Sequence, residues 1–181
     1  MILWLNGPFG VGKTATARSI AEERPAWRLF DPETVGYLLV ANLRDREIAD
    51  FQDLAAWRSL VPQVTAELAA LTAADLIVVQ SVLSEPYWTE LRAGMATAGL
   101  DVFHVLLDCD EAALRDRIRA DEVERDAEQW RLDHIAAYDA ARPWLLDAAD
   151  LVIDTSSVER THVAATVLAA LDDPSRRPSL G

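Results

Sequence analysis

The chain has 181 residues, 51 % of them hydrophobic, and carries a formal net charge of −13. That length and apolar content favour a single folded domain and exclude a disordered chain. The negative charge argues against nucleic acid and anionic membrane surfaces as partners, because both would repel the chain. No apolar run is of membrane-spanning length, no signal peptide precedes the first predicted strand, and a lone cysteine cannot form an internal disulfide, so we expect a cytoplasmic protein without membrane insertion.

Strands and helices alternate along the sequence, and this order predicts a parallel sheet with helical crossovers. We expect strands at 2–6, 28–30, 75–80, 101–108 and 151–154. We expect helices at 14–23, 33–43, 52–71, 86–98, 111–120, 129–147 and 159–171. The strand at 75–80 is the richest in β-branched residues, which indicates the centre of the sheet. Pro143 predicts a break or kink in its helix.

A glycine-rich segment with the pattern G-x-x-x-x-G-K-[ST] follows the first strand, at residues 7–14. Lys13 within it is the single lysine of the chain, whereas the other sixteen basic residues are arginines. Such a loop turns backbone N–H groups towards a phosphate, its lysine reaches the outer phosphates, and the hydroxyl of Thr14 can ligate Mg²⁺. We therefore predict a three-layer α/β P-loop NTPase fold with a parallel five-stranded sheet flanked by helices. ATP and Mg²⁺ would be bound by Gly7, Gly10, Gly12, Lys13, Thr14 and Ala15.

Other features separate the classes of P-loop protein. A GTPase reads guanine with N-K-x-D, which this chain cannot form without a second lysine. Hydrolytic ATPases of the AAA type carry four apolar residues followed by an acid, but the run at 76–79 ends in Gln80-Ser81. The run at 105–108 does end in Asp108, and we interpret that residue as a turn or helix cap.

Two insertions interrupt an otherwise regular domain, which we place at residues 1–172. The first, at about 32–72, is longer than a crossover needs and is a candidate acceptor-binding region. The second, at about 120–130, is polar and is a candidate lid. Residues 173–181 are rich in proline, serine and arginine and are expected to form a flexible tail.

The acceptor site should lie where the second and third strands end. Asp31 is the candidate that orients or deprotonates an acceptor hydroxyl, or ligates Mg²⁺ through water, although an Asp before a proline also suits a helix cap. Glu33 is a weaker second carboxylate. Further candidates for contacts with the substrate are the aromatic faces of Tyr37 and Trp57, the guanidinium of Arg58, and Gln80 at the end of its strand.

The segment Asp108-Cys109-Asp110-Glu111-x-x-Leu114-x-x-Arg117-Ile118 resembles the approach to the lid in nucleoside-monophosphate kinases. The resemblance implies that Arg117 packs against the adenine of ATP, with a catalytic contribution. That pattern usually places an arginine four residues later, where this chain has Asp121, so Arg119 or Arg125 would have to contact the phosphates. By analogy of topology, the segment 155–158, which includes Ser157, would hold the adenine through its backbone.

A closer resemblance covers residues 1–119. The segments 1–14, Phe30-Asp31-Pro32-Glu33-x-Val35-Gly36-Tyr37 and Glu85-Pro86-Tyr87-Trp88 look like the tunicamycin-resistance protein family, also called TmrB-like. This family implies an ATP-binding, kinase-like fold and resistance to a uridine-containing antibiotic.

Together these observations favour an ATP-dependent kinase that acts on a hydroxyl or phosphate of a small molecule, such as a nucleoside-type antibiotic. The alternative is a protein that binds ATP and sequesters its ligand without phosphoryl transfer. The sequence leaves open the acceptor, the preference for ATP over GTP, and whether the protein is a monomer or a homodimer.

Overall fold

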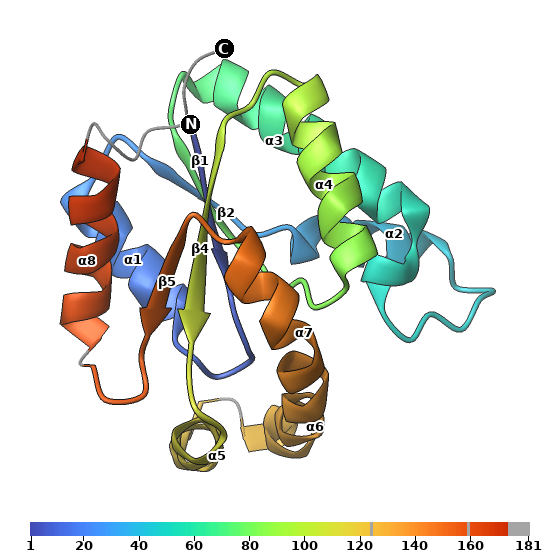
Figure 1. Ribbon diagram of the computed structural model, residues 1–181. Coiled ribbons are helices and arrows are strands. Elements are labelled where there is room, and N and C mark those ends of the chain that lie inside the picture. Colours follow the sequence, from blue (N-terminus) through green and yellow to red (C-terminus); the bar gives the residue numbers. More distant parts are fainter. Residues whose placement is uncertain (124, 159, 174–181) are drawn as a thin grey trace.

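The computed structural model describes residues 1–123, 125–158 and 160–173, and it forms a three-layer α/β domain (Figure 1). Its strands are β1 (Ile2–Asn6), β2 (Arg28–Phe30), β3 (Leu76–Val79), β4 (Val102–Asp108) and β5 (Leu151–Asp154). Its helices are α1 (Lys13–Glu23), α2 (Glu33–Asn42), η1 (Phe51–Asp53), α3 (Ala55–Thr72), α4 (Glu85–Thr97), α5 (Glu111–Ala120), η2 (Arg125–Ala127), α6 (Glu128–Asp133), α7 (Ile135–Ala148) and α8 (Arg160–Asp172). The three-layer fold predicted from the sequence is confirmed.

All strand pairs are parallel, and the order of the five strands in the described part of the chain is β2-β3-β1-β4-β5. The expectation that the strand at 75–80 occupies the centre is wrong, because β1 lies there and β3 is its neighbour. All residues of β1 and β4 are buried as well. An apolar sequence therefore indicates that a strand is buried on both faces of the sheet. It does not indicate which of the buried strands lies at the centre.

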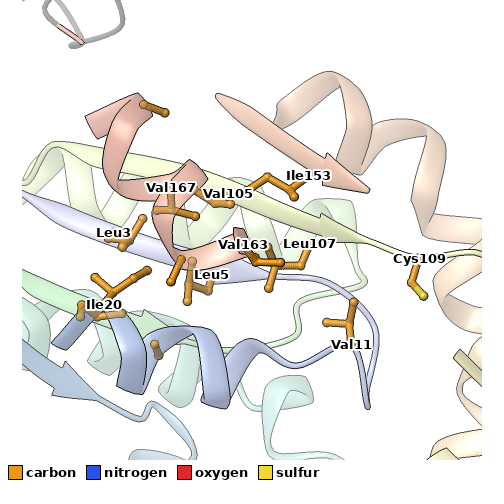
Figure 2. Close-up of a cluster of buried hydrophobic side chains, with 14 of the residues drawn as sticks. Leu3, Leu5, Val11, Ile20, Val105, Leu107, Cys109, Ile153, Val163 and Val167 are labelled. Carbon is orange, nitrogen blue, oxygen red and sulfur yellow. The ribbon is translucent and has the colours of Figure 1, made fainter. Parts of the chain in front are cut away.

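Alternate residues of each strand face opposite layers of helices. Leu3 and Leu5 of β1 and Val105 of β4 pack towards α1 and α8 on one face, in a core that Figure 2 shows. Their neighbours Ile2 and Trp4 face the other layer, which contains α3 and α4. In Figure 1, α1 and α8 accordingly lie to the left of the sheet, and α3, α4 and α7 to its right.

The boundaries of the helices follow local signals in most places. Gly99 follows α4 with φ of +71°, the left-handed conformation expected beyond a helix end. The break expected at Pro143 is absent, because α6 and α7 are separated at His134 and Pro143 lies inside α7. Pro143 and Asp139, the residue four positions before it, are both exposed. Water can therefore accommodate the hydrogen bond that proline removes.

The two insertions differ in structure. The first contains α2, η1 and α3, and η1 begins with Asp50, whose side chain accepts a hydrogen bond from the backbone N–H of Gln52 at 2.8 Å. The second contains η2 and leads into α6. The expected start of the last helix at Glu159, and all of the expected tail except Asp173, lie outside the described residues. Within the described ranges, every helix is too short or too polar to cross a membrane.

His104 of β4 is fully buried, and this predicts a dependence of stability on pH. Its Nδ1 lies 3.1 Å from the carbonyl oxygen of Ala148, its ring packs on Trp88, and its Nε2 meets no partner among the described residues. Burial lowers the pKa of His104 to about 4. The unfolded chain therefore binds one more proton between about pH 6.5 and pH 4, so stability is full above that window and falls as the pH drops through it.

Lowering the pH from 6.5 to 4 is thus expected to cost about 3 kcal/mol of unfolding free energy through His104 alone. Urea titrations across this range would measure the loss. His104→Asn should show a correspondingly shallower decline, whereas His162→Gln, which replaces an exposed histidine, should follow the parent protein. Parallel pH profiles for parent and His104→Asn would contradict the prediction.

Candidate active site

The glycine-rich loop connects β1 to α1 at the carboxyl end of the sheet. Gly7, Gly10 and Gly12 have φ of +140°, +86° and +104°, a region that disfavours other residues. Gly7 also packs tightly, because a Cβ there would lie 2.3 Å from the carbonyl oxygen of Leu107 in β4. The backbone N–H of Gly7 donates to Asn6 Oδ1 at 2.8 Å, which fixes the start of the loop.

Lys13 folds back over this loop. Its ammonium donates to the carbonyl oxygens of Gly7 at 3.0 Å and Pro8 at 2.8 Å and lies 5.5 Å from the ring centre of Phe9. The side chain is only 9 % exposed, so the positive charge is held inside the curve of the loop. A triphosphate placed there would find this charge already in position.

The start of α1 completes an anion site. Gly12 is the N-cap, and no side chain of the described residues caps the helix. The first N–H groups of a helix have no intrahelical partner, and with the helix dipole they attract anions. Thr14 is exposed at this end and Ala15 is half-buried, so the hydroxyl of Thr14 is accessible beside the first turn of α1.

A cavity of about 200 Å³ opens beside the loop, between α1, α5 and the segment after β5. It is smaller than a pocket for a whole ligand and suits one part of a nucleotide. Its lining comprises Gly10, Val11, Gly12, Thr16, Arg117, Thr155, Val158 and Val163.

Arg117 forms one wall of this cavity. Its guanidinium donates to Thr155 Oγ1 at 2.9 Å and to the carbonyl oxygen of Thr155, and it lies 3.5 Å from Cys109 Sγ. Thr155 in turn donates through its N–H and its hydroxyl to the carbonyl oxygen of Asp108, at 2.8 and 2.9 Å. The planar guanidinium is thus fixed at the end of the sheet, beside the cavity.

Two other residues predicted for the nucleotide lie elsewhere. Ser157 is exposed and is not part of the cavity lining, to which Thr155 and Val158 contribute instead. Arg119 is exposed on α5, and no partner for it is found within residues 1–123, 125–158 and 160–173. Two residues of separation on a helix direct Arg117 and Arg119 to different sides.

Arg131 of α6 is a site residue that the sequence did not indicate. It is 6 % exposed and donates from Nη1 to Asp121 Oδ2 at 2.9 Å. Its Nη2 touches the glycine-rich loop, since a Cβ on Gly10 would lie 3.2 Å from it. Asp121 occupies the position where the related kinases were expected to carry an arginine, and here it holds an arginine from the other side of the lid.

Aromatic contacts fix α6 to the loop as well. The ring of Phe9 packs edge-on against Trp130 and His134, with centroid distances of 4.6 and 5.4 Å. Trp130 and His134 also stack on each other at 3.9 Å. Phe9 therefore provides the surface on which α6 packs.

Asp31 follows β2, and β3 lies between that strand and β1. Its Oδ1 accepts a hydrogen bond from the backbone N–H of Glu33 at 2.9 Å, which fixes the turn that leads into α2. Glu33 in turn accepts a 2.8 Å hydrogen bond from the hydroxyl of Tyr37, whose side chain is 60 % exposed. That hydrogen bond, burial and the nearby charges of Glu33 and Asp31 raise the pKa of Tyr37 to about 12.

The remaining acceptor candidates have different surroundings. Trp57 is fully buried, packs on Phe51 and donates from its indole to the carbonyl oxygen of Pro32 at 3.0 Å. The structure thus corrects the stacking role expected for Trp57, because the ring belongs to the core and offers no face to a ligand. Arg58 donates to Glu90 Oε2 at 2.7 Å.

Gln80 lies at the end of β3, buried to 3 % exposure. Its Nε2 lies 3.3 Å from the carbonyl oxygen of Ser81, which also accepts from Gln52 Nε2 at 2.9 Å. The hydroxyl of Ser81 donates to the carbonyl oxygen of Gly7 at 2.8 Å, so the acceptor insertion and the loop share one hydrogen-bonded network.

Asp108, at the end of β4, is already engaged. Arg142 donates to both of its carboxylate oxygens, at 2.9 and 2.7 Å, and the hydroxyl of Tyr138 donates to one of them. The hydrogen bonds from Arg142 hold the pKa of Asp108 below its usual value, against the opposing effect of burial. The carboxylate therefore stays ionised as part of a structural cluster.

The comparisons with known proteins agree with this geometry. A model of the AAA domain family, AAA_33, matches residues 2–144. The tunicamycin resistance protein of Deinococcus radiodurans is similar in structure, with a TM-score of 0.71, 28 % identity, and coverage of 94 % of this chain and 95 % of that one. The resemblance predicted from the sequence is thereby confirmed. No curated protein matches the sequence.

Small-molecule kinases share the fold. The APS kinase CysC of Mycobacterium tuberculosis, solved with AMPPNP and APS, has a TM-score of 0.61 and 18 % identity, with coverage of 95 % of this chain and 97 % of that one. Shikimate kinase of Bacteroides thetaiotaomicron has a TM-score of 0.61 and 16 % identity, with coverage of 94 % and 97 %.

The family description and the missing acid after β3 have to be reconciled. Gln80 and Ser81 stand where an AAA-type hydrolytic ATPase was expected to carry an acidic residue, whereas the solved structures that cover the whole domain include several kinases. The AAA domain match and the kinase-like architecture thus describe the same P-loop core. The family model matches more than half of this chain. The chain therefore belongs to the AAA domain family AAA_33 and has a P-loop kinase-like fold.

Proposed function

We propose that the protein is an ATP-dependent phosphotransferase that acts on a small molecule, such as a nucleoside-type antibiotic, and thereby confers resistance to it. One observation carries this proposal. The glycine-rich loop holds Lys13 between a cavity lined by Arg117 on one side and the strand ends that carry Gln80 and Asp31 on the other. A donor and an acceptor bound in these two places would meet at the loop. The tunicamycin resistance protein named above makes tunicamycin the first candidate.

The transfer requires positioning and charge neutralisation more than covalent chemistry. The acceptor hydroxyl oxygen forms a bond to the γ-phosphorus of ATP, the bond from that phosphorus to the β,γ-bridging oxygen breaks, and ADP leaves. Asp31 takes the hydroxyl proton. Lys13 and Arg131 contact the phosphoryl oxygens as charge moves between them, and α6, packed on Phe9, keeps water from the reacting atoms.

The residues at the loop fit a magnesium ion that accompanies the nucleotide. Mg²⁺ keeps several waters and is bound through one or two protein groups plus phosphate oxygens. Thr14 is exposed at the start of α1 and would supply the direct ligand. The ion, when bound, neutralises charge on the β- and γ-phosphates.

Formation of ADP from MgATP tests the proposal directly. ADP would be measured with and without tunicamycin, uridine, UMP, CMP and UDP-sugars, and each acceptor would be weighed by mass spectrometry. Acceptor-dependent ADP together with a mass gain of one phosphoryl group is the expected result. If ADP formed only at the background rate with every acceptor, the result would contradict the proposed transferase activity.

The charge of Asp31 is expected to be essential for turnover. Asp31→Asn keeps an oxygen for the N–H of Glu33, so the turn that leads into α2 survives and only the base is lost. We expect kcat to fall by about 10²- to 10⁴-fold, the usual contribution of a general base, while calorimetry shows ATP affinity within about threefold of the parent.

Asp50→Asn is the matched control for this substitution. Asp50 caps η1 through the same type of hydrogen bond, to Gln52, and its side chain is exposed. Its kcat should stay within about twofold of the parent, because surface carboxylates outside an active site contribute little. Near-normal turnover of Asp31→Asn would exclude Asp31 as the base.

One observation favours a second candidate, ATP-dependent sequestration without transfer. β3 ends in Gln80-Ser81, and the carboxylate of Asp108 is held by Arg142 and Tyr138. Neither strand end next to β1 therefore offers a free acid. This candidate predicts that a ligand raises ATP affinity while ADP remains at background.

A further inference from the structure

The acceptor side of the site carries an excess of negative charge. Residues 31–58 contain six carboxylates and three arginines. Arg44 and Arg46 lie in the exposed segment between α2 and η1, where Asp45 and Glu47 alternate with them. The end of β2 is followed along the chain by the carboxylates of Asp31 and Glu33. The hydroxyl of Tyr37 donates to Glu33 Oε2 at 2.8 Å, so this carboxylate is held beside the end of β2.

The charge of Arg58, the half-buried arginine of this segment, is already balanced. Its Nε donates to Glu90 Oε2 at 2.7 Å, and its Nη1 donates to the carbonyl oxygen of Gln52 at 2.6 Å. The guanidinium also stacks on Tyr87, 4.2 Å from the ring centre. An anionic acceptor would have to displace Glu90 to use this arginine.

Arginines from the opposite side are balanced in the same way. Arg131 pairs with Asp121 at 2.9 Å, and Arg142 makes a two-pronged contact with Asp108. The triphosphate of ATP, itself strongly negative, would use Lys13, the start of α1 and the guanidinium of Arg131 that lies near Gly10. A second anion next to it would therefore meet carboxylates and paired guanidinium groups.

Gln80 places a second requirement on the acceptor, which is a hydrogen-bond donor. Its Oε1 is buried and has no hydrogen-bond partner among the described residues, although a buried amide oxygen normally finds a donor. Its Nε2 is directed to the carbonyl oxygen of Ser81, so the oxygen is the end of this amide that still lacks a donor within the described ranges. A hydroxyl or N–H group satisfies it, whereas a phosphate, sulfate or carboxylate offers acceptors only.

We infer that the acceptor is an uncharged or cationic hydroxyl compound rather than one that carries phosphate, sulfate or carboxylate, an inference that rests on the proposed function. The new bond joins the γ-phosphorus to a neutral hydroxyl oxygen, its proton passes to Asp31, and ADP leaves. This class excludes nucleoside monophosphates as acceptors and includes nucleosides and their neutral derivatives.

Calorimetry with AMPPNP present tests the inference by binding, independently of turnover. Matched pairs would be titrated, namely uridine against UMP and N-acetylglucosamine against its 1-phosphate, with tunicamycin as a further neutral compound. We expect at least one neutral compound to bind, at least tenfold more tightly than its phosphorylated partner. Equal or tighter binding of the phosphorylated partner, or no binding of any neutral compound, overturns the inference.

Charge variants test the cause of this preference. The double variant Glu33→Gln/Glu90→Gln removes two carboxylates, and the loss of Glu90 also releases Arg58, so it should narrow the ratio of neutral to phosphorylated affinity at least threefold. Glu67→Gln removes one carboxylate nine residues beyond Arg58 on α3, about 14 Å along the helix, and should leave the ratio within twofold. An unchanged ratio in the double variant contradicts the inference.

ADP measurements separate the inference from the proposed function. Selective binding of neutral compounds without ADP formation would contradict the proposed transferase activity but support the inferred preference for a neutral ligand. ADP formation with phosphorylation of UMP or the sugar 1-phosphate would support the proposed transferase activity but overturn the inferred preference for a neutral acceptor.

Discussion

Lys13→Ala is expected to reduce acceptor-dependent ADP formation by about 10³-fold or more, because the ammonium is the fixed positive charge at the reacting phosphates. The substitution should not unfold the loop. The carbonyl oxygen of Gly7 keeps the hydroxyl of Ser81 as a donor, and that of Pro8 keeps the N–H of Val11. Steady-state kinetics would record the loss, and circular dichroism would confirm that the protein remains folded.

Lys13→Arg is the informative companion variant. It restores the charge but replaces a compact ammonium with a planar fork, which does not fit between the carbonyl oxygens of Gly7 and Pro8. We expect it to recover less than a tenth of the parent activity. If Lys13→Ala retained activity within tenfold of the parent, the loop would not be the site of transfer.

Gly7→Ala is expected to lower the unfolding free energy by about 4 kcal/mol, the largest effect on stability that we predict. Two penalties combine in this substitution. The backbone has φ of +140°, and the added Cβ would lie 2.3 Å from the carbonyl oxygen of Leu107, an atom of the neighbouring strand that cannot move alone. Urea or guanidinium unfolding would measure the loss.

Gly99→Ala separates the two penalties. Gly99 also has a positive φ, +71°, but a Cβ there meets nothing within 4 Å. Its replacement should cost about 1 kcal/mol, the price of the left-handed backbone alone. If Gly7→Ala and Gly99→Ala lost equal unfolding free energy, the contact between Gly7 and the carbonyl oxygen of Leu107 in β4 would not be tight.

The sequence predicted the elements of the fold well, because each depends on local patterns. All five strands and the glycine-rich loop were located from apolar runs and glycine spacing, and the structure places them within two residues of the expected ends. The order of strands was harder to predict. β1 and β4 are as buried as β3, so the centre of the sheet depends on which strands pair, and this is not a local property.

The site was only partly predictable for the same reason. The phosphate loop and Arg117 are marked by motifs, whereas the proximity of Arg131 to Gly10 arises from an ion pair across the lid with Asp121. No local spacing indicates such a pair. The burial of Trp57 likewise depends on where α3 packs, and an aromatic residue in a sequence does not reveal which side it will face.

The presence of one lysine has a practical consequence for chemical labelling. An amine-directed acylating reagent finds a single side-chain target in the chain, and that target sits in the phosphate loop. The N-terminal amine, the other primary amine, is ion-paired with Asp75 at the opposite end of the sheet and is resolved from Lys13 by peptide mapping. The extent of acylation at Lys13 would then report occupancy of the loop, so competing nucleotides could be ranked by mass alone, without a chromophore, an engineered tag or knowledge of the acceptor.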